Sequence, residues 1–553
     1  MVHVTAVPKC ARTIDGFGTT APPKLAGERW LHELYFDDLG ASLLRVDLTP
    51  RFRSPVSDVA YHSPWVHGQP GLPGPEGNNV RSYRDLVDYT RSWDGQQPAI
   101  AVLGPDVEQN LTRFDVQAPQ QASVGALARA GAKRASKRDP FKLVGSIWSP
   151  APWLKHSSGA RFEGSGEVMP RAGTPWPFIW AGNFAGGKLD TSDQPRAELD
   201  DGTGPTSALT QFVRITAAYV LGFQRAYGVR FDALSLQNEL NFETFYNSCS
   251  YPDAGAYVTT LKALRRELDR HAELRAIALM GPEDLIDADP YALWQYGAGA
   301  SAVAKNLQYL AAVAADPEAA RALSFFAVHA YSRDGVHGSG DDPKMWRWWL
   351  DGWSSAPAQG LPQQVSGTRA YHKKSWMTES SGEANVWAPE GSGLLTDSAL
   401  GLALKVHQAL TVGEQSAWLY WHLLDGKPVS GETLTDSVLR ERSPKYVAYK
   451  HFARFVRPGS CFVETTVEAG DALHVSAYGH RWHGSTMVLI NTSDSPRSVE
   501  VRDFTEAGAR VELYVSHRAA LWQKRTLRSN HTGLTLELPA RSVTTLRSQA
   551  ARK

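Results

Sequence analysis

Apolar and polar positions repeat along most of the chain, with a short strand-like run before each longer helical stretch. The helical stretches carry apolar residues three and four apart, most clearly at 209–228, which ends in Gly. This alternation is typical of a parallel α/β fold. Beside a further candidate at 98–104, the predicted strands are 13–20, 42–50, 141–150, 231–239, 276–284, 324–332, 375–382 and 416–424.

The pattern changes after about residue 440, where short strands follow one another with turn residues between them and almost no helix. Such spacing predicts an antiparallel sandwich. The segment "HVTAVP" near the N-terminus predicts one more strand for it. We therefore expect a (β/α)8 TIM barrel over 13–440 and a β-sandwich formed by 1–12 and 441–553.

Composition narrows the functional classes. The net charge of +1 and the 21% of charged residues give no reason to expect nucleic acid or an anionic membrane as partner. No apolar run is long enough to span a bilayer, and no signal peptide is visible. The 18 Trp residues are roughly twice average usage, and indole rings stack well on sugars. The three Cys residues, at 10, 249 and 461, allow at most one disulfide and show no zinc spacing.

Polar and aromatic residues gather where the predicted strands end, which is where TIM barrels carry their catalytic groups. Two carboxylates stand out because each directly follows a strongly apolar run, Glu239 after "ALSLQN" and Glu379 after "SWMT". A pair of carboxylates suits hydrolysis of a glycosidic bond, one as acid and the other as nucleophile or base. The alternative is that each is a structural salt-bridge or capping partner. The other strand-end residues are Arg45, Trp148, Asn238, Glu283, Asp284, His329, Tyr331, Trp421 and His422.

These segments resemble glycoside hydrolase family 30, through "IDGFGTT", "GSIWSPAPWLK", "SLQNEL", "AVHAY", "SWMTES", "SAWLYWHLL" and "SPKYVAYKHFARFVRPG". The resemblance runs from about residue 13 to beyond 455, and the later strands look like that family's appended sandwich. It implies a retaining enzyme in which Glu239 is the acid/base and Glu379 the nucleophile. Their order agrees if 98–104 is not a barrel strand. Retention requires carboxyl groups about 5–5.5 Å apart.

Other residues receive supporting roles. Arg45 and Tyr331 are expected to hold down the pKa of Glu379 by donating to it, although Arg45 has the alternative of a structural ion pair. Asn238 is placed to bind the sugar 2-hydroxyl. By the resemblance, Trp421 forms the floor beneath the sugar. The remaining candidates are Trp148 and Trp153 as pocket walls, His329 as a contact to substrate or to Tyr331, and Glu283 and Asp284 as reserve carboxylates.

A tryptophan-rich stretch at 342–353 stands apart from these motifs. The spacing of Trp346, Trp349 and Trp353 predicts one face of a short helix docked on the barrel, and Trp348 belongs to the same cluster. Two of the four are expected to be core residues, and the others are candidates for an aromatic platform that binds a sugar.

The predicted function is a retaining glycoside hydrolase that cleaves β-linked polysaccharide or oligosaccharide, endo-acting on xylan or a β-1,6-linked glucan or galactan. The alternatives are an exo-acting β-glycosidase, a transglycosylase and a non-catalytic carbohydrate-binding protein. No metal or phosphate motif is present, so we expect no cofactor. We expect a monomer that is secreted or periplasmic, with a carbohydrate substrate as its only partner.

Overall fold

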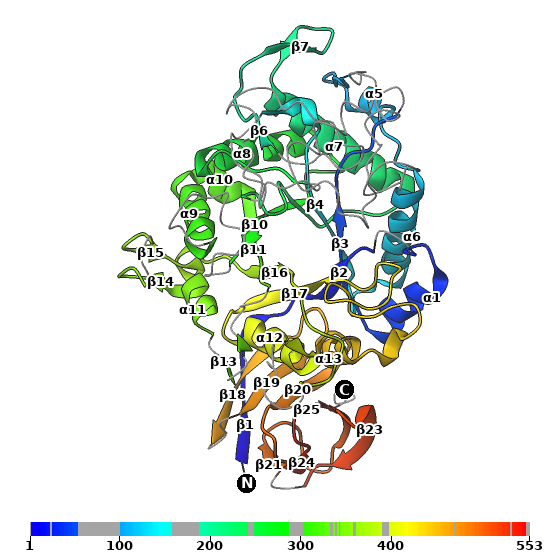
Figure 1. Cartoon of the computed structure of the whole chain (residues 1–553), viewed down its shortest axis with the longest axis vertical. Coiled ribbons are helices and arrows are strands. Elements are labelled where there is room, and N and C mark those ends of the chain that lie inside the picture. The colour runs from blue at the N-terminus through cyan, green and yellow to red at the C-terminus, as the bar shows by residue number, and fades with distance from the viewer. Residues whose placement is uncertain are drawn as a thin grey trace.

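The computed structural model contains a closed barrel of eight parallel strands and a separate nine-stranded sheet (Figure 1). The predicted fold class is confirmed. Much of the loops after the second and third barrel strands lies outside the described residues. These are 2–22, 25–53, 100–156, 187–241, 248–286, 302–331, 336–337, 340–341, 343–357, 361–389, 397–468, 472–530 and 533–548.

Eight parallel strands close the barrel in sequence order. Residues 100–104 form no strand, so Glu239 follows the fourth barrel strand and Glu379 ends the seventh. Apolar side chains such as Leu43, Val144 and Trp376 fill the interior between the strands. The strands are β2 (Gly16–Thr20), β3 (Leu43–Asp47), β4 (Lys142–Ser146), β9 (Ala233–Ser235), β10 (Ala278–Leu285), β11 (Leu323–His329), β16 (Ser375–Glu379) and β17 (Gln415–His422).

Helices surround the barrel on its outer face (Figure 1). The helix predicted at 209–228 begins after Ser207, whose side chain caps it, and ends at Gly228 with φ of 63°. The Ala-rich stretch after residue 301 forms two helices that are divided before Pro317, because Pro cannot continue a helix from its interior. The outer helices are α1 (Arg29–His32), α6 (Pro119–Arg134), α7 (Ala208–Tyr227), α8 (Ala254–Arg270), α9 (Ala302–Ala315), α10 (Pro317–Ala322), α12 (Ala399–Thr411) and α13 (Pro444–Ala453).

Short helices and short strand pairs lie in the loops between the main elements. Helical turns are η1 (Glu33–Asp38), α5 (Val107–Leu111), η3 (Pro152–Leu154), η5 (Thr368–Tyr371) and η7 (Arg440–Arg442). Four short pairs are β5 (Lys155–His156) with β6 (Lys188–Leu189), β7 (Arg196–Asp200) with β8 (Pro205–Thr206), β12 (Val336–His337) with β13 (Gly340–Asp341), and β14 (Gly352–Trp353) with β15 (Val365–Ser366). Among the described residues, no helix has the length and apolar character needed to cross a bilayer.

The tryptophan-rich stretch forms α11 (Lys344–Asp351). Trp346 and Trp349 are fully buried against the barrel. Trp348 and Trp353 are half-buried and meet edge to face with their rings 5.9 Å apart. Trp353 does not share the helical face, because the helix ends before Gly352 and Trp353 lies in β14.

The nine-stranded sheet is built around β1 (Val2–Thr13), which lies where the sequence predicted a strand. β1 pairs antiparallel with β18 and parallel with β21. The prediction of a wholly antiparallel arrangement is therefore wrong at this pair of strands. Val4, Leu489, Val499 and Leu536 meet in one buried core. The other strands are β18 (Cys461–Glu468), β19 (Leu473–His480), β20 (Gly484–Asn491), β21 (Arg497–Arg502), β22 (Arg510–His517), β23 (Ala520–Arg528), β24 (Leu534–Leu538) and β25 (Ser542–Ser548).

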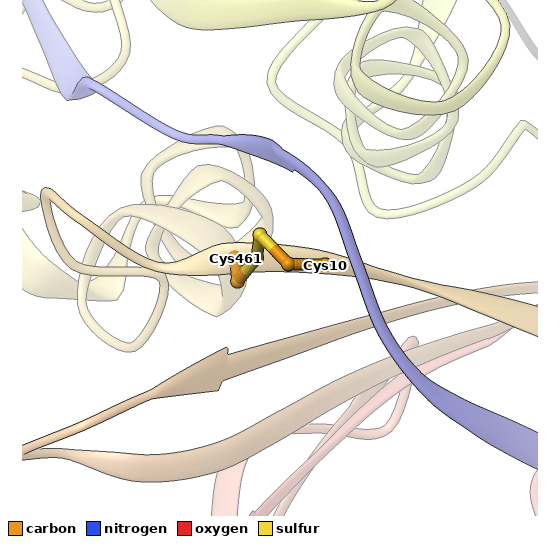
Figure 2. Close-up of a disulfide and its surroundings, with 2 residues drawn as sticks. All are labelled: Cys10 and Cys461. Carbon is orange, nitrogen blue, oxygen red and sulfur yellow. A yellow bond between two sulfur atoms is a disulfide. The ribbon is translucent and has the colours of Figure 1, made fainter.

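A disulfide joins two strands that are far apart in the sequence, β1 and β18 (Figure 2). Cys10 in β1 is bonded to Cys461 in β18, with the two Cα atoms 5.4 Å apart, and Cys249 is a buried free thiol. Helix α13 contacts both barrel strand β2 and sheet strand β25. In that contact, the ring nitrogens of the buried His451 lie 2.8 Å from the hydroxyls of Thr545 and Ser516.

Candidate active site

The carboxyl-terminal ends of the barrel strands bring the predicted residues together. Arg45 lies in β3, Glu239 follows β9, His329 ends β11 and Glu379 ends β16. The exposed fractions are 0% for Arg45 and His329, 8% for Glu239 and 4% for Glu379. Polar groups this deeply buried must satisfy one another, so their mutual contacts define the chemistry of the site.

The two carboxylates face each other across His329. One oxygen of Glu239, one oxygen of Glu379 and a ring nitrogen of His329 all lie within 4.8 Å of one another. His329 Nδ1 is 2.9 Å from Glu239 Oε1 and 3.7 Å from Glu379 Oε1. The imidazole is therefore hydrogen-bonded to the predicted acid/base. Among the described residues, no side-chain hydrogen bond joins His329 to Tyr331.

Arg45 is the centre of the polar network. Its Nη1 donates to Glu379 Oε2 at 2.5 Å and its Nη2 to Asn238 Oδ1 at 2.5 Å. Its Nε donates to Glu283 Oε1 at 2.9 Å. Both interpretations of Arg45 thus hold, because the same guanidinium binds the predicted nucleophile and forms a fully buried ion pair.

The ionisation of Glu379 is balanced between opposing effects. Tyr331 donates its hydroxyl to Glu379 Oε1, as expected. Burial nevertheless raises the pKa of the Glu379 carboxyl, and the neighbouring charge of Glu239 adds to that increase. The charges of His329 and Arg45 and the Tyr331 hydrogen bond lower it, but burial outweighs them. The expected donors are present and lower the pKa of Glu379, although its net shift is upward.

The adjacent carboxylates Glu283 and Asp284 are driven in opposite directions. Burial opposes the ionisation of Glu283, but the positive charge of Arg45 and the His329 hydrogen bond lower its pKa to about 2. Burial raises the pKa of Asp284 to about 6, against a hydrogen bond from Asn241. Glu283 is thus an anion at neutral pH. Its role as the partner of Arg45 was not predicted, although its position at a strand end marked it as a reserve carboxylate.

The predicted aromatic residues differ in how far their side chains are exposed. Trp421 is half-buried, and its ring centroid is 5.8 Å from that of Trp148. The Arg45 guanidinium lies 4.2 Å over the Trp148 ring, so one face of that indole is already covered. Trp153 is 6% exposed and packs 5.3 Å from Phe52 in the core. Trp421 therefore offers the more accessible aromatic surface.

Two small hydroxyls complete the network and were missed by sequence reasoning. Ser146 donates to Glu283 Oε2 at 2.7 Å and accepts from Arg45 Nε at 3.1 Å. Thr20 accepts from Arg45 Nη1 at 3.2 Å. Both residues lie at the carboxyl ends of strands, but Ser and Thr are too common there to be a signal without coordinates.

The cluster of Glu239, His329 and Glu379 also has the ligand types that bind divalent cations. Arg45 already occupies Glu379 Oε2, and His329 Nδ1 faces Glu239. The protein's own cations therefore compensate the carboxylates, and the arrangement fits acid–base chemistry without a metal.

Fold and site geometry together define a TIM-barrel protein with a buried pair of carboxylates at the carboxyl ends of the fourth and seventh strands. Comparisons with known proteins agree with this class. No family model matches the sequence. The glucuronoxylanase XynC of Bacillus subtilis is 25% identical over 180 residues, which are 31% of this chain and 39% of that protein. The chain thus spans about two fifths of the length of that curated relative.

Solved structures are similar over nearly the whole chain. The catalytic domain of GH30 xylanase C from Talaromyces cellulolyticus has a TM-score of 0.61 and 15% identity, with 99% of this chain and 100% of that chain covered. A GH30 endoxylanase from Clostridium papyrosolvens has a TM-score of 0.59 and 16% identity, with 99% and 100% covered. An endo-β-1,6-glucanase has a TM-score of 0.58 and 14% identity, with 99% and 94% covered. The resemblance to glycoside hydrolase family 30 is therefore confirmed for the fold.

Proposed function

We propose that the protein is a retaining glycoside hydrolase that cleaves β-glycosidic bonds by double displacement, with Glu239 as acid/base and Glu379 as nucleophile. The observation that carries the proposal is the buried pair itself. An oxygen of Glu239 and an oxygen of Glu379 lie within 4.8 Å of each other. This supports the short carboxyl separation of a retaining enzyme, about 5–5.5 Å, over the about 6.5–9.5 Å that an inverting enzyme needs to admit water.

In the first step, Glu239 protonates the glycosidic oxygen while Glu379 attacks the anomeric carbon. Arg45 and Tyr331 each bind one oxygen of Glu379, which orients the attacking carboxylate. Arg45 also holds the amide oxygen of Asn238. The NH2 group of Asn238 is then the donor for the sugar 2-hydroxyl, a contact that strengthens as the oxocarbenium ion forms.

The first step breaks the glycosidic bond and consumes the negative charge of Glu379 in the glycosyl–enzyme bond. In the second step, Glu239, now an anion, accepts a proton from water while the water oxygen attacks the anomeric carbon. This attack breaks the bond to Glu379, restores its carboxylate and releases the sugar with its original anomeric configuration. His329 stays hydrogen-bonded to Glu239 Oε1 and stabilises its anionic form. Trp421 supplies the apolar floor on which the sugar ring stacks.

The proposed substrates are xylan or a β-1,6-linked glucan or galactan, attacked within the polymer. The similar proteins support the first two, because they include xylanases and an endo-β-1,6-glucanase. The disulfide between Cys10 and Cys461 supports a secreted or periplasmic location, since disulfides persist in oxidising compartments. We further propose a monomer whose barrel is residues 13–440, with 1–12 and 441–553 as a bracing domain.

The proposal is tested with purified protein on glucuronoxylan, β-1,6-glucan, β-1,6-galactan and aryl β-glycosides. We expect oligosaccharides from one polymer, and NMR of the first product should show the β anomer. The Glu379→Gln variant should lose activity on every substrate by several orders of magnitude, because the covalent step needs its carboxylate. A first product of inverted configuration would refute the mechanism.

The Glu239→Gln variant separates the two roles. It should lose about 10²–10⁴-fold on poor leaving groups, which need protonation. On a dinitrophenyl glycoside, whose leaving group needs no proton, bond cleavage should persist as a burst before slow hydrolysis. Equal losses on both substrates would contradict the acid/base assignment. Cleavage of aryl glycosides alone would favour an exo-acting enzyme.

A further inference from the structure

Glu283 is a buried carboxylate that the two-step mechanism does not use, yet it contacts the groups that the mechanism needs. Its Oε1 accepts from Arg45 Nε at 2.9 Å and lies 3.6 Å from His329 Nε2. Its Oε2 accepts from Ser146 at 2.7 Å. The exposed fraction of its side chain is 0%, so solvent does not share in neutralising it.

Arg45 and His329 explain why an anion is required at this point. Arg45 Nη2 and His329 Nε2 are only 3.4 Å apart. When His329 is protonated, both groups are positive and neither can accept from the other, so their approach is unfavourable without a shared anion. Glu283 Oε1 is that shared anion, because the same oxygen faces Arg45 Nε and His329 Nε2.

The backbone also links Glu283 to the proposed acid/base. Glu239 and Glu283 both have positive φ, of 49° and 59°. Residues with side chains cost about 1–2 kcal/mol in this left-handed region, and such outliers are concentrated at functional sites. The amide of Glu239 donates to the carbonyl of Glu283 at 2.9 Å. The two strained residues therefore fix each other's position.

We propose that Glu283 is a positioning residue whose negative charge holds Arg45 in place and keeps His329 protonated beside Glu239, and thereby sets the alkaline limit of activity. This inference rests on the proposed function. With Glu283 and Glu379 as anions and Arg45 and His329 as cations, the charges cancel when Glu239 carries its proton. Burial opposes the charging of His329, but Glu379, Glu239 and Glu283 together raise its pKa to about 10.

The other titratable groups around Glu283 do not replace its charge. Burial, and after it the charge of Glu283, raise the pKa of Tyr257 on α8, so its hydroxyl stays neutral. Burial raises the pKa of the neighbouring Asp284 to about 6, and its contact is with Asn241. Removal of the Glu283 charge therefore leaves the network with one excess positive charge, and the network must release its proton at a lower pH.

The test is the pH dependence of kcat/KM for Glu283→Gln, which removes the charge and keeps the shape. We expect the alkaline limb to move down by about one pH unit or more, and Glu283→Asp to restore much of the wild-type limb. Glu383→Gln is the matched control, because Glu383 is also fully buried and paired, to Lys405 at 2.7 Å, but does not contact this network. Its limb should stay at the wild-type pH.

A fall in activity by the same factor at every pH, with the limb unmoved, would reduce Glu283 to a structural role and overturn the inference. If Glu283→Gln does not fold, NMR of the wild-type protein with labelled histidine decides. The signal of His329 is assigned as the one that is lost in His329→Gln. Its chemical shift should remain that of a protonated imidazole through pH 8, and a titration near pH 6.5 overturns the inference. Activity retained in Glu379→Gln would instead overturn the proposed function, so the two failures are distinguishable.

Discussion

Arg45→Lys tests whether the site depends on the shape of the guanidinium or only on its charge. Arg45 makes five hydrogen bonds inside the barrel, to Thr20, Ser146, Asn238, Glu283 and Glu379. Lysine keeps the positive charge but has only three donors on one atom. At least two buried acceptors must then lose their partner.

The cost follows from that count. A buried acceptor left without a donor costs about 1–3 kcal/mol, so the free energy of unfolding should fall by about 2–6 kcal/mol. The single ammonium group of lysine cannot bind Asn238 and Glu379 at the same time as the planar guanidinium of Arg45 does. If one contact realised in the transition state is lost, kcat/KM should fall about 10²–10³-fold.

Urea titration followed by tryptophan fluorescence measures the stability, and initial rates on the preferred polymer measure kcat/KM. The matched control is Arg266→Lys, because Arg266 on α8 pairs with Glu318 at 2.6 Å and both side chains are exposed on the outside of the barrel. It should change stability by about 1 kcal/mol or less and leave the rate unaltered. The reasoning is refuted if Arg45→Lys keeps its rate within threefold of wild type.

Three further changes test other parts of the structure. Tyr331→Phe removes the hydroxyl that binds Glu379, so kcat should fall about 10–100-fold with little change in KM; an unchanged kcat would exclude a role for this contact. Cys10→Ser, or reduction of the disulfide to Cys461, should lower unfolding free energy by about 2–4 kcal/mol while kcat stays the same; equal urea midpoints with and without reductant would contradict this. Burial lowers the pKa of His451 to about 3. Below about pH 6.5 the imidazole therefore binds a proton in the unfolded chain but not in the folded protein. The free energy of unfolding should fall by up to about 1.4 kcal/mol for each pH unit of acidification. The His451→Gln variant should flatten this slope, measured as Tm between pH 7 and 4.

The strand-end residues show how far sequence reasoning reaches. Glu239 and Glu379 follow apolar runs whose order agrees with the fourth and seventh strands only if 98–104 is not a barrel strand. The structure shows no strand at 100–104 and brings the two carboxylates together. Arg45 and Tyr331 lower the pKa of Glu379 as expected, but burial raises it by more, because desolvation depends on how completely the barrel encloses the group. Trp353 was wrongly assigned to the helical face, because the end of α11 depends on the conformation of Gly352 rather than on apolar spacing.

Local periodicity along the sequence was sufficient to predict the barrel, the strand-rich region after it and the pair of carboxylates at strand ends. The reason is that strands repeat their apolar positions every two residues, whereas helices repeat them every three to four. Tertiary structure alone decided that Glu283 binds Arg45, which is 238 residues away along the chain. It also decided that β1 pairs with both β18 and β21. These contacts join distant residues, and their energies depend on burial and distance, which no local pattern records.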